Sequence, residues 1–242
     1  MPRFFIDSIP SGKTVLTGAD GKHIARSLRM VVGEPLTLCD GQGTDYACEI
    51  EKINGDEVLV RVLSSCPSIS EPTVHVTVYQ GLPKADKMDS IVQKAVEIGA
   101  VAVVPVMTAR CVSKPDEKSA QKKIERWQKI SEEAAKQSGR GIIPRVEPLM
   151  SLKQAAQQAV KNSRVLLFYE GGGESLSKLI SRENTDKEIS IFIGPEGGFE
   201  PEEVELIVSL GGKTATLGTR ILRTETAPIA AIAAIMLASG NM

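Results

Sequence analysis

The chain has 242 residues, of which 42% are hydrophobic and 24% are charged, and these proportions are typical of a soluble globular protein and argue against a disordered chain. Its length suits one large or two modest domains, and we prefer two. Because 29 Lys and Arg residues are balanced by 30 Asp and Glu residues, no global positive field indicates a nucleic-acid partner, which would have to be bound through local patches.

Metal-binding, disulfide and targeting patterns are missing from the sequence. The four cysteines form no C-x-x-C pair, and no two histidines stand at the spacing of metal ligands, which argues against a disulfide scaffold and a zinc site. The start MPRFFIDSIPSG lacks the long apolar region of a signal peptide, and the most apolar run, at 227–238, is too short to cross a bilayer. We therefore expect a cytoplasmic protein that holds no metal.

The first part of the chain, up to about residue 70, consists of short β-rich runs separated by turn residues. Runs of this length, punctuated by Asp-Gly and Asn-Gly, predict antiparallel strands with tight turns and hence a small β-barrel. The runs are RFFI (3–6), KTVLTG (13–18), EPLTLCDGQG (34–43), DYACEIEKING (45–55) and DEVLVRVLSS (56–65).

One stretch of this part, DGKHIARSLRMV, has a helical rather than an alternating pattern. Ile24, Leu28 and Val31 recur at helical spacing and predict one short helix. Charge alone leaves two interpretations of its basic residues open, a solvated helix face or a patch for RNA phosphates. These basic residues are Lys22, His23, Arg26 and Arg29.

The segment CPSISEP, at 66–72, has the small polar residues and prolines of a linker, so we place a domain boundary at about residue 70. After it, strands alternate with helices, which predicts an α/β domain whose mainly parallel sheet is covered on both faces. Five apolar residues share one face of the first helix: Met88, Ile91, Val92, Ala95 and Val96. The expected strands are 74–80, 101–106, 164–170, 188–194 and 213–218, and the expected helices are 84–100, 116–137, 151–160, 175–181, 201–210 and 226–239.

Three of the later strands end in loops of unusual composition. RVLLFYE runs into three glycines at 171–173, EISIFIG runs into Pro195 and Glu196, and KTATLG runs into Thr219 and Arg220. Parallel sheets bind ligands beyond the carboxyl ends of their strands, so the three loops together predict one pocket. A single glycine-rich loop of this kind could equally be a plain surface turn.

The last of these loops, LGTRILRTETAP, could serve simply to begin the final helix, with a threonine as its N-cap. That interpretation leaves Arg220, Arg223 and Glu225 unexplained, because charges crowded at a strand end more often serve a site. The sequence has neither G-x-G-x-x-G nor G-x-x-x-x-G-K-[ST], which argues against a Rossmann dehydrogenase and a P-loop enzyme.

Taken together, IGPEGGF, LGTRILRTETA, LPKADKMDSIVQKAVEIGA and KQSGR resemble the RsmE family, the 16S ribosomal RNA (uracil-N3)-methyltransferases of the SPOUT superfamily. The likeness extends over the whole chain, from MPRFF and HIARSLRM to the last helix. It implies a PUA-like β-barrel RNA-binding domain over residues 1–70 and a SPOUT methyltransferase domain over 71–242, with a parallel sheet and a deep trefoil knot. The knot follows from the resemblance alone, because chains almost never thread loops.

The resemblance implies S-adenosylmethionine (S-adenosyl-L-methionine) as the methyl donor, held in a bent form by the knot loops, and no metal. Glycines in IGPEGG would keep side chains out of the way, so that backbone amides and carbonyls reach the donor. Carried over by motif, the donor-binding residues are Tyr169, Glu170, Gly171, Ile193, Gly194, Pro195, Glu196, Gly197, Gly198, Leu217, Gly218, Ile221, Leu222 and Thr224.

Methylation of uracil at N3 requires the loss of a weakly acidic proton and an in-line approach of the nitrogen to the sulfonium methyl group. A cation near the uracil oxygens would stabilise the developing anion, and Arg223 is our first choice and Arg140 our second. Glu225 would accept the proton or, as we prefer, hold Arg223 in place through a charge-assisted pair.

The resemblance also favours RNA contacts for the basic residues of the first part, where Arg3 joins Lys22, His23, Arg26 and Arg29 as phosphate contacts that position RNA. The expected partners are 16S rRNA in the small ribosomal subunit and a second copy of the chain in a C2 homodimer. Two alternatives stay open: a ribose 2'-O RNA methyltransferase of the same superfamily, and a non-catalytic RNA-binding ribosome-assembly factor.

The chain departs from the family pattern at Glu200, where many relatives have Ser or Thr. We therefore expect a weaker N-cap for the helix at 201–210. Pro201 at its start and acidic residues in its first turn would partly offset this loss.

Overall fold

The computed structural model describes residues 1–8, 10, 12–180 and 186–242. By its internal contacts the chain divides into two compact units. The first comprises Met1–Glu71 and Ala135–Ile143, and the second comprises Pro72–Ala134 and Pro144–Met242. The first unit thus includes a segment from the middle of the chain, which lies outside the expected domain of residues 1–70.

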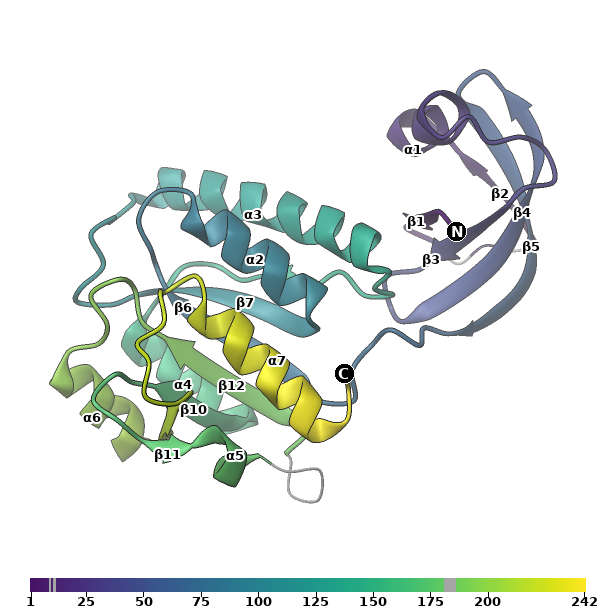
Figure 1. The fold of residues 1–242 in the computed structure, drawn as a ribbon. Coiled ribbons are helices and arrows are strands. Elements are labelled where there is room, and N and C mark those ends of the chain that lie inside the picture. The colour runs from purple at the N-terminus through teal and green to yellow at the C-terminus, as the bar shows by residue number, and fades with distance from the viewer. Residues whose placement is uncertain (9, 11, 181–185) are drawn as a thin grey trace. The chain divides into compact units, whose positions relative to one another are not determined.

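The first unit contains a curled five-stranded sheet in the order β1-β3-β4-β5-β2 (Figure 1). Its strands are β1 (Arg3–Phe5), β2 (Lys13–Leu16), β3 (Pro35–Cys39), β4 (Thr44–Asn54) and β5 (Glu57–Pro67). Neighbours are antiparallel as predicted, except that β1 runs parallel to β3, with Phe4 opposite Leu38. The chain passes through β2 and two helices before it returns as β3, and a connection of that length can join parallel neighbours.

The helical stretch of this unit is shorter than predicted. The helical stretch ends at Ser27, so the prediction of one helix that extends to Val31 was wrong. Ile24 is fully buried, whereas Leu28 and Val31 are 41% and 59% exposed. The helix widens into a π-turn, in which the Leu28 N–H donates to the His23 carbonyl, and Arg29 then adopts a left-handed φ of 52°. The two helices are α1 (Gly18–Lys22) and the π-helix η1 (His23–Ser27).

The second unit is built on a parallel sheet in the order β11-β13-β10-β12-β6-β7-β8, with β9 paired to β7. All of its described strand pairs are parallel, which confirms the predicted sheet. The strands are β6 (His75–Gly81), β7 (Ala100–Met107), β8 (Arg145–Val146), β9 (Met150–Ser151), β10 (Arg164–Phe168), β11 (Glu174–Ser175), β12 (Glu188–Ile193) and β13 (Lys213–Thr216).

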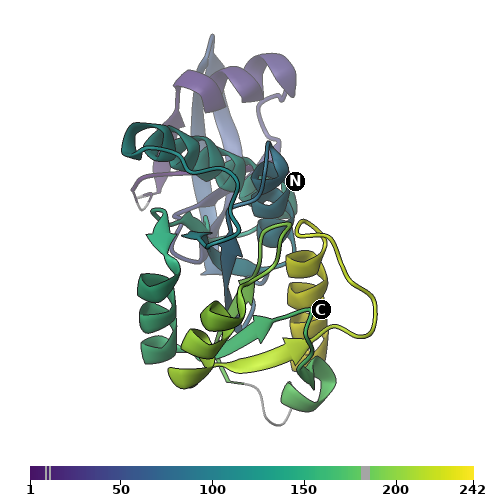
Figure 2. The same ribbon diagram turned by 90° about the vertical axis from the view of Figure 1, so that its left-hand side faces the viewer.

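Helices cover both faces of this sheet (Figure 2). Residues of α2, α3, α5 and α7 pack in one hydrophobic cluster and residues of α4 and α6 in another, with sheet residues in both. The helices are α2 (Lys87–Glu97), α3 (Glu117–Ser138), α4 (Leu152–Asn162), α5 (Leu176–Leu179), α6 (Pro201–Ser209) and α7 (Ala227–Ser239). Ser181, the last residue of the helix predicted at 175–181, lies outside the described residues.

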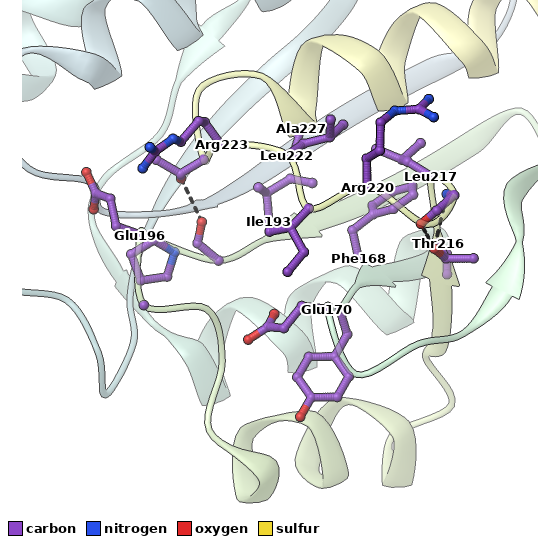
Figure 3. Close-up of a pocket in the computed structure, with 18 of the residues that line it drawn as sticks. Phe168, Glu170, Ile193, Glu196, Thr216, Leu217, Arg220, Leu222, Arg223 and Ala227 are labelled. Atoms are coloured by element: carbon purple, nitrogen blue, oxygen red, sulfur yellow. Dashed lines mark hydrogen bonds between the residues drawn. The ribbon is translucent and has the colours of Figure 1, made fainter.

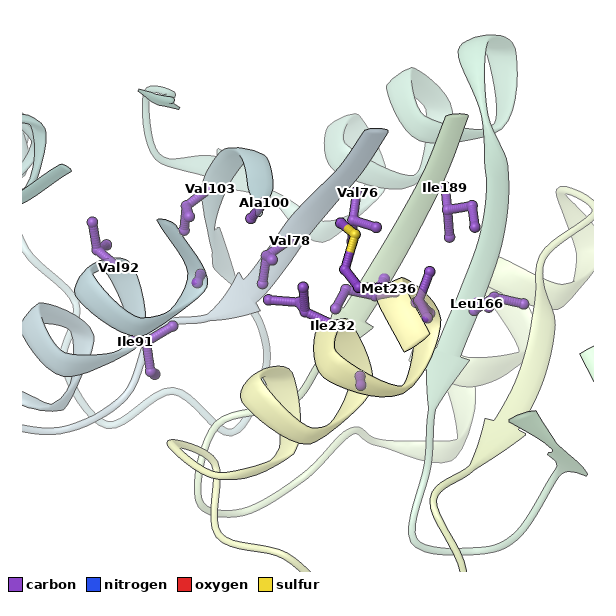
Figure 4. Packing of buried hydrophobic residues seen from close by; sticks show 14 of the residues in the cluster. Val76, Val78, Ile91, Val92, Ala100, Val103, Leu166, Ile189, Ile232 and Met236 are labelled. Carbon is purple, nitrogen blue, oxygen red and sulfur yellow. The ribbon is translucent and has the colours of Figure 1, made fainter. Parts of the chain in front are cut away.

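The core of this unit follows the alternation of side chains along its strands. Val76 and Val78 of β6 meet Ile232 and Met236 of α7 on one face (Figure 4). Tyr79 points to the opposite face, where its ring stacks on Phe192 with the ring centroids 4.5 Å apart. The predicted apolar face of α2 is fully buried: Met88, Ile91, Val92, Ala95 and Val96. The trefoil knot stays a prediction.

Within the described part of the chain, no helix combines the length and the apolar character that a membrane span needs.

Candidate functional site

Three adjacent strands of the second unit end at one level of the sheet. β10 lies between β12 and β13, and Phe168 at its end is in register with both Ile193 and Ala215. Because the three strands are parallel, the loops that follow them leave the sheet side by side. This is the arrangement in which open α/β sheets bind ligands.

A cavity of about 570 Å³ opens between these loops (Figure 3). As predicted, all three strand ends contribute to it. The predicted donor-binding residues that line it are Tyr169, Glu170, Ile193, Gly194, Pro195, Glu196, Gly197, Leu217, Gly218, Ile221, Leu222 and Thr224. Gly171 and Gly198 are not among the described lining residues, and the sequence analysis missed four: Phe168, Ala215, Thr216 and Ala227.

Two glycines allow the cavity wall to close tightly. A Cβ on Gly81, at the end of β6, would lie 2.5 Å from Cδ of Pro195, so only glycine lets the turn of the IGPEGG loop approach this strand. Gly198 has a φ of 69°, and a side chain there would collide with the carboxylate of Glu170. Gly198 therefore leaves room for Glu170, a lining residue, although it is not itself among the described lining residues.

A buried polar network fixes the IGPEGG loop to the loop before α7. Thr224 is 6% exposed, and its Oγ1 donates to the Gly194 carbonyl at 2.7 Å. The fully buried Gln80 of β6 donates from Nε2 to Thr224 Oγ1 at 3.0 Å, while its Oε1 has no hydrogen-bond partner among the described residues. Sequence analysis missed Gln80 because a single polar residue at a strand end carries no pattern.

Lys87, the first residue of α2, connects two acidic residues at the site. Its Nζ lies 3.0 Å from Glu196 Oε1 and 3.2 Å from Glu225 Oε2. Burial alone would raise the pKa of the Glu196 carboxyl, but hydrogen bonds from backbone N–H groups and from Lys87 hold that pKa below its usual value. Hydrogen bonding to Glu196, with a smaller contribution from Glu225, raises the pKa of Lys87. The spacing of RTETA suggested Arg223 as the partner of Glu225, whereas the structure pairs Glu225 with Lys87.

Arg110, from the loop after β7, holds the other side of the IGPEGG loop. Its guanidinium donates to the Gly197 carbonyl at 2.7 Å and makes two hydrogen bonds of 2.9 Å with the Glu200 carboxylate. This pairing lowers the pKa of Glu200 and raises that of Arg110. At the start of α6, the Glu203 carboxylate accepts the Glu200 N–H at 2.9 Å, so an acid in the first turn provides part of the cap expected to be weak.

The two arginines of the last loop differ in orientation. Both line the cavity, but Arg223 and Glu196 lie on the same side of it, while Arg220 points to the opposite side (Figure 3). Arg223 is exposed, as a residue that meets a large substrate must be. Its catalytic role stays a prediction.

Arg140, the second choice for catalysis, is found in the first unit. It is 2% exposed, and its guanidinium donates to Glu71, with the shortest distance, 2.7 Å, between Nη2 and Oε2. Glu71 also accepts the N–H of Gly141 at 2.8 Å. This network gives Arg140 a structural role within its unit, and its catalytic role stays a prediction.

The predicted RNA-binding residues fall into two groups in the first unit. Arg3 makes a bidentate pair with Asp45, at 2.7 and 2.9 Å, and Arg26 makes one with Asp56, at 2.8 and 2.9 Å. The others are exposed on and just after the short helices: Lys22, His23 and Arg29. Within the described ranges, no group of three or more His, Cys, Asp or Glu residues could hold a metal ion.

Comparison with known proteins agrees with this geometry. The RNA methyltransferase domain family matches residues 70–236, and the RNA methyltransferase PUA domain family matches residues 16–63. The chain is 38% identical to ribosomal RNA small subunit methyltransferase E of Bacillus subtilis (strain 168), over 97% of this chain and 96% of that protein. It is 31% identical to the protein of that name from Mycobacterium bovis, over 96% and 90% of the two chains.

A solved structure shows the same likeness. The crystal structure of a ribosomal RNA small subunit methyltransferase E from Neisseria gonorrhoeae bound to S-adenosyl methionine has 32% sequence identity, a TM-score of 0.86, and coverage of 98% of this chain and 97% of that one. Fold, cavity and full-length sequence similarity therefore lead to one conclusion. This chain belongs to the family of ribosomal RNA small subunit methyltransferase E proteins.

Proposed function

We propose that this protein is an S-adenosylmethionine-dependent methyltransferase that methylates N3 of a uridine in 16S rRNA of the small ribosomal subunit. The observation that carries the proposal is a cavity that the ends of β10, β12 and β13 share, which is lined by glycine-rich backbone and bordered by Arg223. A family member of similar fold is described as bound to S-adenosyl methionine. The proposed site of action implies a cytoplasmic protein.

The residues of the cavity fit such a donor. Its volume of about 570 Å³ lies in the range of about 300–1,000 Å³ that is usual for small-molecule sites. Ile193 and Leu222 offer apolar surface for a base or a thioether chain, and the Glu170 carboxylate can accept hydrogen bonds from hydroxyl or ammonium groups. The backbone of the IGPEGG loop, held by Gln80 and Arg110, offers amides and carbonyls that do not need to reorganise on binding.

S-adenosylmethionine would supply an electrophilic methyl group on its sulfonium sulfur. The task of the chain is then to hold the uracil N3 in line with that group and to stabilise the negative charge that develops on the uracil oxygens. Arg223 is our candidate for the second task, and its exposure at the cavity, on the same side as Glu196, supports this choice. Glu225 is the candidate for receiving the N3 proton or for orienting this segment.

RNA binding and self-association belong to the same proposal. Exposed Lys22, His23 and Arg29 of the first unit would contact phosphates, which position RNA without reading its sequence. A C2 homodimer would cover apolar surface on α7, where Leu237 is 67% exposed. Light scattering during gel filtration at several concentrations tests for the dimer.

The direct test is methyl transfer to small ribosomal subunits isolated from a strain that lacks this protein. With labelled S-adenosylmethionine, we expect one methyl group per subunit, and mass spectrometry of digested RNA should place it on N3 of a uridine. A methyl group on a ribose oxygen would favour the ribose methyltransferase instead. Failure to bind the donor in calorimetry would favour a non-catalytic assembly factor.

A further inference from the structure

The start of α2 combines two features that are unfavourable for local structure. Lys87 places a positive charge at the helix N-terminus, where the helix dipole disfavours cations. Ala85, two residues earlier, has a φ of 52°, a left-handed conformation that residues with a Cβ rarely adopt. Unfavourable local features such as these two are expected to occur together at functional positions, where contacts with the surrounding structure hold the strained backbone in place.

Lys87 makes contacts that can explain why the charge and the strained turn are retained here. Its ammonium lies between the carboxylates of Glu196 and Glu225, at 3.0 and 3.2 Å. The Lys84 N–H, in the strained turn itself, also donates to Glu196, at 3.2 Å from Oε1. The turn before α2 and the first residue of α2 therefore both contact a carboxylate of the donor cavity.

The two acids belong to different parts of the site. Glu196 lines the donor cavity, whereas Glu225 follows Arg223 by two residues and precedes α7. Glu225 Oε2 is shielded from solvent and lies 3.2 Å from the Lys87 ammonium, so the Lys87 charge is what compensates it. Without that charge, two carboxylates that now meet at one nitrogen would repel each other.

We propose that Lys87 is a positioning residue for methyl transfer, whose ammonium ties the donor loop at Glu196 to the Arg223–Glu225 segment and so sets the distance between donor and uracil. The inference rests on the proposed function. Lys87 touches neither reactant in this scheme. It acts through the two carboxylates, and through Glu225 on the backbone that carries Arg223.

The test compares three variants of the full chain in single-turnover methyl transfer at saturating donor and RNA. Lys87→Met removes the charge and keeps much of the apolar stem. Lys87→Arg keeps a cation that can reach both acids. Lys94→Met is the matched control, because Lys94 lies on the same helix and pairs with Glu97 at 2.8 Å, and neither is among the described residues that line the cavity.

We expect Lys87→Met to lower the saturated rate by about 10- to 100-fold, since small misplacements of reacting groups have effects of this size. Lys87→Arg should recover most of the rate, and Lys94→Met should keep the wild-type rate. Calorimetry should show a smaller loss of donor affinity than of rate in Lys87→Met. If Lys87 only stabilised the fold, Lys87→Met would lower the melting temperature, and the rate would not fall more than the donor affinity.

Two results would overturn the inference. The first is a wild-type rate for Lys87→Met at saturation, and the second is a loss that extra donor fully restores, since Lys87 would then affect donor binding alone. Wild-type protein that binds donor but methylates no subunit would instead overturn the proposed function. The wild-type reaction thus separates the two failures.

Discussion

Three paired arginines of the first unit differ in their surroundings from Arg223 of the second unit, although the second unit also contains a paired arginine, Arg110. In the first unit, Arg3 and Arg26 each make a bidentate pair with an aspartate, and Arg140 pairs with Glu71. In the second unit, Arg223 stands exposed at the cavity and has no ion-pair partner in the part of the chain that the structure describes. An arginine already paired within its own unit stabilises the fold, whereas an unpaired one beside a cavity is available to a ligand. Position in sequence cannot distinguish the two cases.

We expect the largest effect from substitution of Arg223, an arginine without an ion-pair partner among the described residues. Arg223→Ala should lower the rate of methyl transfer by about 100- to 1,000-fold, the usual cost of removing a group that stabilises transition-state charge. Donor affinity in calorimetry should change by less than about threefold, because in the proposed site the donor would be held mainly by backbone groups. Arg220→Ala is the comparison, since Arg220 points to the opposite side of the cavity. Equal losses of rate in both variants would contradict the assignment of Arg223.

The paired arginines should affect stability instead. Arg3→Ala leaves Asp45, whose side chain is 11% exposed, without its cation and should lower the free energy of unfolding by about 2 kcal/mol. Arg26→Ala breaks a pair of the same geometry whose side chains are 63% and 37% exposed, and it should cost less than about 1 kcal/mol. Urea unfolding followed by circular dichroism measures both. Similar values for the two variants would show that burial does not separate these pairs.

The exposed basic residues of the first unit should affect RNA affinity alone. Lys22→Ala should weaken binding to small subunits a few-fold and reduce the slope of log affinity against log salt by about 0.9, as expected for one lost phosphate contact. Lys52→Ala, an exposed lysine on β4 of the same unit, serves as control. An unchanged salt slope in Lys22→Ala would remove Lys22 from the RNA-binding surface.

The smallest effect concerns a thiol beside Arg3. Burial raises the pKa of Cys39 from 9.0 to about 12, although the positive charge of Arg3 opposes this rise. Because the folded state favours the neutral thiol, its contribution to stability is complete below pH 9 and is lost as the pH rises towards 12. At pH 8, iodoacetamide should therefore modify the exposed Cys66 and spare Cys39 in the native protein, as peptide mass spectrometry can show. Equal modification of the two would contradict this arrangement.

Features with a local pattern could be predicted from the sequence. The apolar face of α2 has helical periodicity, and the strands that end in glycine-rich loops are short apolar runs. Parallel strands present their carboxyl ends at one edge of the sheet, so the order of strands and helices predicted the cavity. The motifs predicted most of the residues that line it. The first helical stretch was predicted less well, because a π-turn changes the spacing on which the prediction depended.

Contacts between distant residues could not be predicted in this way. Lys87 lies more than a hundred residues before both of its acidic partners, and Arg110 is ninety residues before Glu200. Gln80 donates a hydrogen bond to Thr224, which lies 144 residues later in the chain. No periodicity or spacing encodes such pairs, so the residues that support the cavity from outside its motifs became visible only in three dimensions.

The level endings of β10, β12 and β13 restrict how this chain can diverge. Successive residues of a strand face opposite sides of the sheet, so an insertion or deletion of one residue within β10 would turn Phe168 to the other face and displace Tyr169 from the cavity. Insertions and deletions are therefore expected in segments away from this edge of the sheet, while the lengths of these three strands are expected to stay the same in active relatives.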